Sequence, residues 1–397
     1  MTIHIARLDE VCEINPRMPK SISDSDIASF LPMAAVSEDG LIDFEEARAV
    51  REVKKGYTYF ERGDVLVAKI TPCFENGKAA RTSALTKPFG FGSTEFHVLR
   101  AGNEVDPSYL FHLIWNSKFR EVGANNMTGS AGQKRVPTDF LRRVEIPLPP
   151  LSEQRRIAAV LDKADALRRK RKHTIELLDS LMQSIFLEMF GPRSTQRASW
   201  TITKLADLCT SRAGIKAGPF GSALKKEDYT SAGYRVYGQE QVIGGSLDIG
   251  DYYISESKFR SLQSCAIAAG DVLVSLVGSF GRVLVVPEKH EAGIINPRLL
   301  RLRPDTRMAL PIFLKGLLSS QHAQASLQAV SRGGTMGILN AGILRELDVV
   351  CPPITSQLEY QRRVEKLESL MAASRLALLQ VLHIFSSLQS RAFSGQL

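Results

Sequence analysis

The chain has 397 residues, of which 44% are hydrophobic and 23% are charged, values that are typical of a folded protein and exclude a disordered one. This length predicts two or three domains, each able to bury a sizeable core. There are 51 Lys and Arg residues against 42 Asp and Glu residues, and the resulting charge of +9 favours a polyanionic partner.

The cellular compartment is predicted from the cysteines and the N-terminus. Five scattered cysteines without CxxC spacing argue against a disulfide framework and a zinc site, so a reducing cytoplasm is expected. The first residues, MTIHIARLDEV, lack the basic start and apolar core of a secretory signal. The most apolar stretch, residues 265–280, is too short to span a bilayer and contains Asp271. The sequence therefore predicts a soluble, cytoplasmic protein with no membrane partner.

Residues 1–150 form the first predicted domain. Short β-rich runs such as residues 64–70 (DVLVAKI) alternate with Gly, Pro and Asn, a pattern typical of an α+β unit with many loops. Pro147, Pro149 and Pro150 end this domain, because proline lacks a backbone donor and pushes the preceding residue towards extended geometry.

Residues 151–191 are predicted to form one long helix. Residues 152–190 contain no Gly or Pro, Ser152 can cap the first turn, and Gly191-Pro192 ends the helix. At 1.5 Å per residue, about 39 residues make a rod of roughly 58 Å. Apolar residues spaced three and four apart predict a coiled-coil seam. The seam consists of Ile157, Val160, Leu161, Ala164, Leu167, Ile175, Leu178, Leu181, Met182, Ile185, Phe186 and Met189.

A second domain is predicted at residues 198–353, followed by a second long helix at residues 354–393. This helix is expected to begin near Ser356 and to end near Ala392. An apolar stripe on an isolated helix would be exposed to water, so the two helices are predicted to pack on each other. The second seam consists of Val364, Leu367, Met371, Leu378, Val381, Phe385 and Leu388.

The second half of the chain repeats the first with a period near 200 residues. This period is too long for a solenoid and fits one domain plus one connecting helix. The predicted fold is therefore α+β: two α/β domains separated by two long helices that form an antiparallel coiled coil, with pseudo-twofold symmetry. The repeated landmarks are residues 63–67 and 270–274 (GDVLV in both), 8–12 (LDEVC) and 205–209 (LADLC), 141–146 (LRRVEI) and 344–349 (LRELDV), and 154–157 (QRRI) and 361–364 (QRRV), the last pair implying four extra residues at the second junction.

The sequence contains no recognisable catalytic or cofactor motif. Residues 218–222 (GPFGS) are followed by Ala223, where a Walker A loop requires lysine. Residues 296–298 (NPR) lack the second proline and the aromatic residue of the DNA amino-methyltransferase motif. The seven histidines are isolated from one another and show no zinc spacing. The chain is therefore predicted to hold no cofactor or metal and to have no catalytic residue.

Two glycine-rich loops with basic residues are candidate DNA contacts. Residues 129–135 (GSAGQKR) correspond to residues 331–337 (SRGGTMG), and glycine lets the backbone approach a ligand whose phosphates Lys and Arg can meet. Residues 215–226 join a stiff turn to three lysines, and glutamines that follow can bind adenine edges in the major groove. For each single residue, and for the basic run at residues 168–172, a solvated surface position is the simpler alternative. The candidates are Lys54, Lys55, Lys69, Thr71, Asn76, Lys78, Arg81, Gln133, Lys134, Arg135, Lys216, Ser222, Lys225, Lys226, Gln239, Gln241 and Arg332.

The chain resembles the specificity (S) subunit of type I restriction-modification systems, and the resemblance covers essentially the whole chain. The junction at residues 147–157 (PLPPLSEQRRI), followed by a long helix, is the most specific feature. The other features are residues 218–222 (GPFGS) with Asp228-Tyr229 after them, both GDVL runs, and residues 69–73 (KITPC) with residues 75–78 (ENGK).

The resemblance implies two target-recognition domains, each of which binds one half of a split, asymmetric DNA sequence. It also implies that the long helices act as spacers and dock two methyltransferase subunits, through which restriction motor subunits join. S-adenosylmethionine, ATP and Mg²⁺ would then belong to the partner subunits, and this chain would have no activity of its own.

Two other functional classes stay open from the residues alone. A coiled-coil assembly scaffold with protein-binding globular ends would show the same repeat and helices, and a salt-dependent mobility shift on random duplex would separate it from a DNA-binding subunit. A fused enzyme that methylates or cuts DNA by itself would be detected by a methyl-transfer assay on the purified chain.

Overall fold

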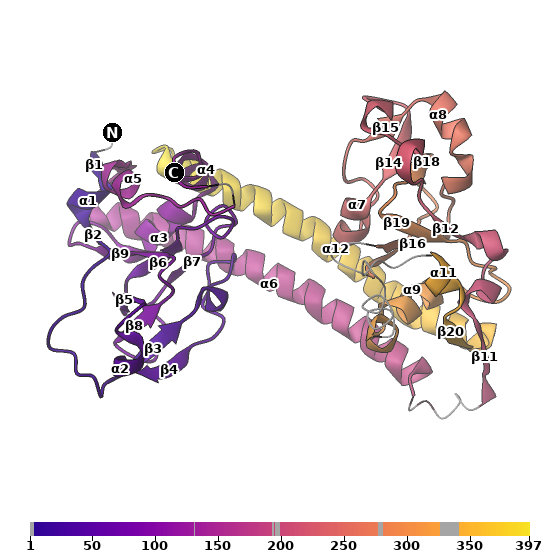
Figure 1. Ribbon diagram of the computed structural model, residues 1–397, viewed down its shortest axis with the longest axis horizontal. Helices are drawn as coiled ribbons and strands as arrows, with labels where there is room; N and C mark the ends of the chain where they lie inside the picture. Colours follow the sequence, from indigo (N-terminus) through magenta and orange to yellow (C-terminus); the bar gives the residue numbers. More distant parts are fainter. Residues whose placement is uncertain (1–3, 131, 193, 195–198, 277–280, 326–340) are drawn as a thin grey trace. The chain divides into compact units, whose positions relative to one another are not determined.

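The computed structural model describes residues 4–130, 132–192, 194, 199–276, 281–325 and 341–397. The chain divides into two compact units (Figure 1). The first comprises Met1–Lys172 and Leu376–Leu397, and the second comprises His173–Arg375. Each unit therefore contains one end of each long helix.

The first unit contains two four-stranded sheets and a short two-stranded one (Figure 1). The main sheet has the order β2-β9-β6-β7 and is antiparallel, whereas the order β4-β3-β8-β5 includes one parallel pair, β3 with β8. The strands are β1 (Ile5–Arg7), β2 (Cys12–Ile14), β3 (Ile27–Leu31), β4 (Glu46–Ala49), β5 (Thr58–Glu61), β6 (Val65–Ala68), β7 (Ala79–Arg81), β8 (Phe89–Gly92), β9 (Phe96–Ala101) and β10 (Glu145–Pro147). The helices are α1 (Leu8–Val11), α2 (Val50–Val53), α3 (Pro107–Trp115), α4 (Ser117–Asn125), α5 (Thr138–Arg143) and the 3-10 turn η1 (Met33–Ala35).

The main sheet of the second unit has the same strand arrangement as that of the first, whereas its other sheet has the order β13-β15-β14-β18, with the parallel pair at one edge. Its antiparallel main sheet has the order β12-β19-β16-β17, and in its other sheet β14 and β18 form the parallel pair. The strands are β11 (Thr201–Lys204), β12 (Ile215–Ala217), β13 (Tyr229–Thr230), β14 (Tyr234–Tyr237), β15 (Tyr253–Ile254), β16 (Val272–Ser275), β17 (Val283–Val285), β18 (Gly293–Ile295), β19 (Leu299–Leu302) and β20 (Asp348–Cys351). The helices are α7 (Gln239–Gly244), α8 (Glu256–Ser261), α9 (Pro311–Ser319) and α11 (Ala341–Arg345), with 3-10 turns η3 (Leu205–Leu208), η4 (Arg212–Gly214), η5 (Gly221–Ala223), η6 (Lys226–Asp228) and η7 (Gln263–Cys265).

The repeated GDVL motif forms the buried central strand of each main sheet. All four residues of β6 are buried, and because side chains alternate across a strand, Val65 and Val67 enter one core while Leu66 and Ala68 enter another. The first core includes α3 and the long helices, and the second lies between the two sheets. A strand covered on both faces needs a continuous apolar sequence, which explains the motif.

The aspartate of the same motif forms a buried ion pair in each unit. Asp64 accepts two hydrogen bonds from the guanidinium of Arg100, both of 2.9 Å, and Asp271 accepts two from Arg303, of 2.8 and 2.7 Å. Asp64 and Asp271 are 2% and 1% exposed. The bidentate geometry ties the start of each central strand to its neighbour β9 or β19.

The long helices are α6 (Leu151–Phe190) and α12 (Ile354–Phe393), each of 40 residues. Each unit pairs the beginning of one helix with the end of the other, so their packing is antiparallel, as predicted. In the first unit Ile157 and Leu161 share a core with Phe385, and in the second Phe186 packs edge-on against Tyr360, with 5.5 Å between the ring centroids. The predicted α+β fold with an antiparallel helix pair is confirmed.

The predicted seam differs from the observed one at two positions, and the predicted cap is not used. Leu167 and Leu181 are 45% and 47% exposed. Helix α6 begins at Leu151, and the backbone of Pro150 accepts from the N–H groups of Glu153 and Gln154, so Ser152 lies inside the first turn.

Gln154 and Gln357 join the start of each long helix to its domain in the same way. The Gln154 side chain accepts from Asp106 N–H and donates to the carbonyls of Glu104 and Pro149. The Gln357 side chain accepts a hydrogen bond from the backbone N–H of Leu310 and donates to the backbone carbonyls of Met308 and Pro352. Both glutamines are fully buried. Gln357, and not Gln361, is therefore the counterpart of Gln154, and the predicted four extra residues at the second junction do not exist.

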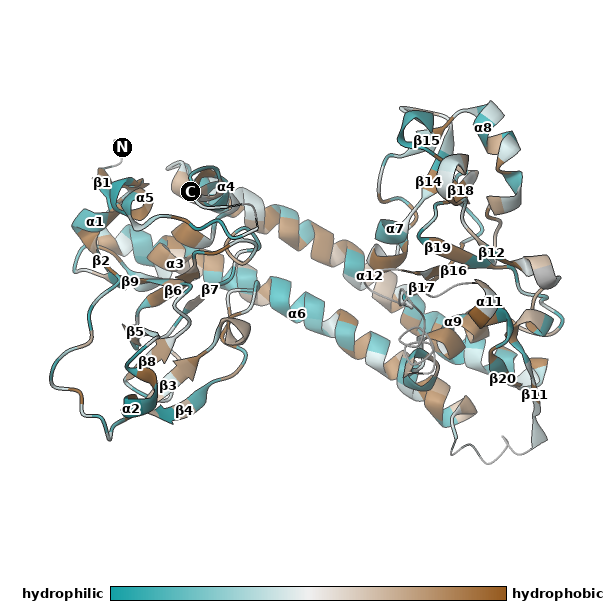
Figure 2. Cartoon of the chain, in the orientation of Figure 1, coloured by the Kyte–Doolittle hydropathy of each residue, from teal (hydrophilic) through white to brown (hydrophobic). Residues whose placement is uncertain are grey.

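Polar and apolar residues alternate along both long helices (Figure 2). Some of the apolar side chains, such as those of Leu376 and Leu379 in α12, are exposed. By length and composition alone, α12 is apolar enough to cross a membrane, although one such helix is weak evidence for a span. The predicted absence of a membrane span rested on residues 265–280 as the most apolar stretch, and the apolar window in α12 contradicts that choice. The packing of both ends of α12 into the two protein cores argues for a helix that is used within the protein.

Candidate nucleic-acid interface

The glycine-rich loop of the first unit lies against the end of the central strand. Thr71 N–H donates to Lys134 O (3.0 Å), and Val136 N–H donates to Lys69 O (2.8 Å). Gly129 and Gly132 have φ of +122° and +82°, a conformation that favours glycine. The structure therefore brings together two groups of predicted DNA contacts that are about 60 residues apart in the sequence: Lys69 and Thr71 with Gln133, Lys134 and Arg135.

Among the described residues of this loop, the exposed side chains are Ser130, Gln133 and Lys134. Arg135 forms a bidentate ion pair with Glu95, with the shortest contact 2.8 Å. The hydrogen bonds from Arg135 lower the pKa of the Glu95 carboxyl. Arg135 thus holds the base of the loop, while the tip carries the groups that are available to a ligand.

Several other candidates in the first unit have intramolecular partners. Arg81 contacts Asp162 of α6 at 2.9 Å and lies 5.0 Å from the Phe111 ring centroid, so it joins the domain to the helix. A role for Arg81 in DNA contact conflicts with this arrangement. The remaining candidates pair as follows: Lys54 with Asp24, Thr71 with Glu75, Asn76 with Glu38, and Lys78 with the Met33 carbonyl, while Lys55 is exposed.

In the second unit the exposed candidates gather after β12. Ser222, Lys225 and Lys226 are exposed and follow the turn at residues 218–221, whereas Lys216 is half-buried in the strand. Gln241 is 1% exposed, and its side chain bonds to Gly238 N–H and the Ile249 carbonyl, so the prediction that it contacts bases is not supported by its position.

Three further points complete the placement of the predicted residues. Gln239 is half-buried at the start of α7. Arg332 and its loop, residues 331–337, lie outside the described residues. Arg298, which the sequence analysis considered only within a failed methyltransferase motif, is exposed, and its N–H bonds to Asn296 Oδ1 at 2.9 Å.

The basic run on α6 is largely neutralised within the first unit. Arg168 contacts Asp39 and Asp165 at 2.8 Å each and lies 5.4 Å from the Trp115 ring centroid. Lys172 also pairs with Asp39. Burial raises the pKa of Asp39, but the hydrogen bonds from Lys172 and Arg168 outweigh burial and lower it. This run therefore joins the loop at residues 36–43 to the helix.

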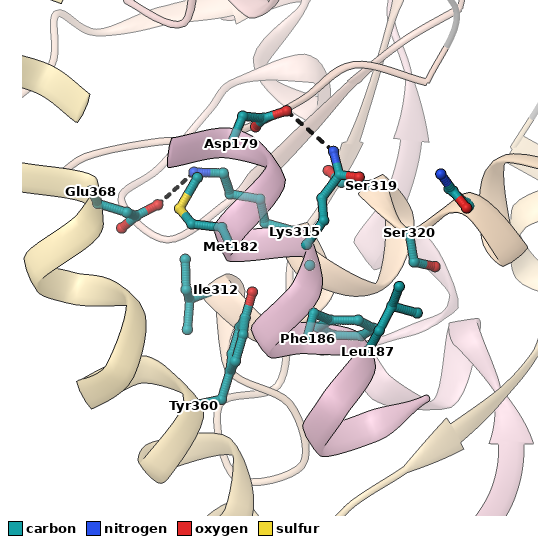
Figure 3. Close-up of a pocket in the computed structure, with 13 residues that line it drawn as sticks. Asp179, Met182, Phe186, Leu187, Ile312, Lys315, Ser319, Ser320, Tyr360 and Glu368 are labelled. Carbon is teal, nitrogen blue, oxygen red and sulfur yellow. Dashed lines mark hydrogen bonds and ion pairs between the residues drawn. The ribbon is translucent and has the colours of Figure 1, made fainter. Parts of the chain in front are cut away.

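A small pocket in the second unit lies where α6, α9 and α12 meet (Figure 3). Its volume is about 40 Å³, little more than a few waters need. Met182, Phe186 and Tyr360 form its apolar wall, and Lys315 pairs with Glu368 at its edge. These residues belong to the helix packing. Among the described residues no group of three or more His, Cys, Asp or Glu could hold a metal ion.

The first repeat of the chain is similar to a known protein family. Residues 2–177 match the family described as the type I restriction modification DNA specificity domain. The resemblance inferred from the sequence is thereby confirmed for residues 2–177, which are similar to this specificity domain.

Individual relatives are specificity subunits of type I restriction enzymes. The EcoAI specificity subunit of Escherichia coli is 35% identical over 221 residues, which cover 53% of this chain and 37% of that subunit. The chain thus spans well under two thirds of that relative. The MjaVIII specificity subunit of Methanocaldococcus jannaschii is 21% identical over 384 residues, covering 92% of this chain and 86% of the relative.

Solved structures share the fold over nearly the whole chain. The type I restriction-modification S subunit from M. genitalium has a TM-score of 0.56 at 15% identity and covers 99% of this chain and 96% of that one. A second solved chain comes from a structure described as the basis of complex assembly and conformational transition of the type I R-M system. It has a TM-score of 0.50 at 21% identity, and the match covers 99% of this chain and 98% of that one. At these identities the likeness establishes the fold alone.

Proposed function

We propose that this chain is the DNA-specificity subunit of a type I restriction-modification system. Each unit binds one half of a bipartite, asymmetric DNA sequence, and the long helices dock methyltransferase subunits and act as spacers between the half-sites. The chain itself performs no catalysis, and S-adenosylmethionine, ATP and Mg²⁺ belong to its partners. The observation that carries the proposal is the specificity-domain match over residues 2–177, together with the recurrence of the main-sheet topology in the second unit.

The DNA contacts are proposed at loop tips with exposed cations. In the first unit these are Lys55, Gln133 and Lys134, and in the second they are Lys225 and Lys226. Lysines supply salt-dependent phosphate affinity, while neighbouring polar side chains contact base edges. The two units have different residues at these tips, which fits an asymmetric target.

Exposed apolar side chains on the helices support the docking of partner subunits. Leu376, Leu379 and Ile384 of α12 are 59%, 63% and 53% exposed, and Leu177 of α6 is 56% exposed. Solvent-exposed leucines on a helix are typical of protein interfaces. Such a surface would equally suit a scaffold protein, so DNA binding is the property that must be tested.

The test is selection of duplexes from a random 40-base-pair pool by the full-length chain, followed by binding measurements at several salt concentrations. We expect enrichment of two short sequences at a fixed separation. The slope of log affinity against log salt should fall by about 0.9 for each phosphate-contacting lysine that is removed. Lys134→Gln and Lys225→Gln should each lower this slope, whereas Lys163→Gln, on the exposed side of α6, should not.

Failure to bind any duplex at low salt would contradict the proposal and favour the scaffold. Methyl transfer by the purified chain alone would instead show that it is an enzyme.

A further inference from the structure

The turn that follows the first strand of each main sheet has the same construction in both units. After β2 the chain runs Asn15-Pro16-Arg17, and after β12 it runs Gly218-Pro219-Phe220. Asn15 N–H donates to Val98 O at 2.8 Å, and Gly218 N–H donates to Leu299 O at 3.1 Å. Each turn is thus fixed to the main sheet by its first residue, and the residue after proline is exposed.

In the second unit this position holds a large apolar side chain. Phe220 is 64% exposed, although burying a phenylalanine side chain is worth roughly 2–3 kcal/mol. The exposure is imposed by the backbone. A Cβ atom on Gly218 would lie 1.9 Å from the Asn296 carbonyl oxygen, so the turn packs directly on residues 296–297. Gly221 has a φ of +60°, and Leu224, which follows, is buried and anchors the other side.

Three cations stand in the segments next to Phe220, where the exposed Glu227 is also found. Lys225 and Lys226 follow on the same turn, and Arg298 extends from the segment on which Gly218 packs. None of these three cations forms an ion pair within the described residues, in contrast to Lys258, which pairs with Asp228 at 2.9 Å. An exposed aromatic ring among unpaired cations is complementary to DNA, whose backbone is anionic and whose base steps accept apolar side chains.

We propose that Phe220 is a wedge that inserts between two base pairs of the half-site bound by the second unit, with Lys225, Lys226 and Arg298 on the flanking phosphates. The inference rests on the proposed function. Arg17, exposed at the same point in the first unit, contacts a groove there without unstacking bases, since a guanidinium suits a narrow minor groove. The equivalent turns then act differently on the two half-sites.

The test compares the full chain with its Phe220→Ala and Phe220→Leu variants on a duplex carrying the selected sequence. Phe220→Ala should weaken binding roughly 5- to 100-fold, as loss of an aromatic stacking contact does, and Phe220→Leu should weaken it less. The salt slope should stay unchanged because no charge is lost. Ile202→Ala removes a side chain that is 68% exposed in β11 and should bind as the parent does.

A second measurement locates the wedge. With 2-aminopurine in place of each adenine in turn, the parent should raise fluorescence at one step of one half-site, and Phe220→Ala should abolish the rise. Equal affinity of Phe220→Ala and the parent would overturn the inference, as would loss of methyltransferase co-purification with unchanged DNA affinity, which would make Phe220 a protein contact. Absence of binding by the parent would instead remove the proposed function.

Discussion

Asp64 and Asp271 occupy the same place in the two units and are paired with arginines in the same bidentate geometry. Replacement of Asp64 by Asn keeps the shape but leaves the Arg100 guanidinium, 25% exposed, with Glu61 at 3.0 Å as its remaining carboxylate partner. Breaking a buried pair from one side costs about 3 kcal/mol or more, and because Glu61 remains, we expect the unfolding free energy of the first unit to fall by about 2 kcal/mol. Urea denaturation measures it.

Asp271→Asn should affect the second unit in the same way. Arg7→Ala, which removes a half-exposed partner of Asp9, is the matched control and should cost less than about 1 kcal/mol. Equal effects of the buried and exposed pairs would contradict the assignment.

Asp162 on α6 makes the stability of the first unit depend on pH. Burial raises the pKa of this carboxyl, but hydrogen bonds from His112 and Arg81 outweigh burial and hold the pKa at about 2, below its ordinary 3.8. The unfolded chain therefore binds the proton more tightly than the folded chain does. The stabilisation is complete above about pH 4 and is lost as the pH falls towards 2.

We therefore expect the difference in urea midpoint between the parent and Asp162→Asn to shrink between pH 5 and pH 2.5. Ser108→Ala removes another partner of Arg81, at 3.0 Å, without removing a titrating group, so its difference from the parent should not vary with pH. A constant difference for Asp162→Asn would show that the carboxylate contributes nothing through its ionisation.

At the scale of single elements, the two glutamines at the helix starts give a direct test of the repeat register. Gln154→Ala or Gln357→Ala leaves one buried N–H and two carbonyls without their partner, which should cost about 2–4 kcal/mol. Gln361, the counterpart suggested by sequence, bonds only to Glu365 on the helix surface. Gln361→Ala should change stability by less than about 0.5 kcal/mol. Thermal or urea unfolding of the three variants distinguishes the two alignments.

The same glutamines show why sequence predicted the elements better than their register. The long helices were predictable within a few residues, because 39 residues without Gly or Pro leave little alternative. The QRR motif at residues 361–363 was a more obvious match than a lone glutamine four residues earlier, and only burial identifies Gln357. The predicted seam was wrong at Leu167 and Leu181, because the spacing of apolar residues defines a helix face but not the partner that covers it.

The candidate site was predictable in part for a similar reason. Composition and glycine spacing indicated the loop at residues 129–135 correctly as an exposed basic loop. They could not separate Lys134, which faces solvent, from Arg135 and Arg81, which pair with carboxylates distant in sequence. Phe220 was not among the predicted contacts, because the sequence does not show whether an aromatic side chain in a turn is buried, whereas the structure leaves it 64% exposed.

For the whole molecule, duplication accounts for two units with the same main-sheet topology that differ in their other sheet and at their loop tips. A single offset of 203 residues relates both the first and the last residues of α6 and α12. The same offset relates the two glutamines, and Phe190 to Phe393, each packed against the core of its own unit. The helix ends are therefore the part of the repeat that has kept its register, as expected if the length of the helices itself has a function.

The last prediction tests the helices as a spacer, and it rests on the proposed function. Both helices run from one unit into the other, so four residues inserted into α6 after Lys172 lengthen it by roughly 6 Å. At about 3.4 Å per base pair, the spacer between the selected half-sites should grow by one or two base pairs while both half-sites keep their sequence. Four residues are close to one full helical turn of about 3.6 residues, so the apolar residues after the insertion still point in nearly the same direction as before. Repeating the duplex selection with the insertion variant measures the spacing. A changed half-site with an unchanged spacer would show that the helices do not set the distance, because a spacer can alter the separation of two binding surfaces but not the chemistry of either.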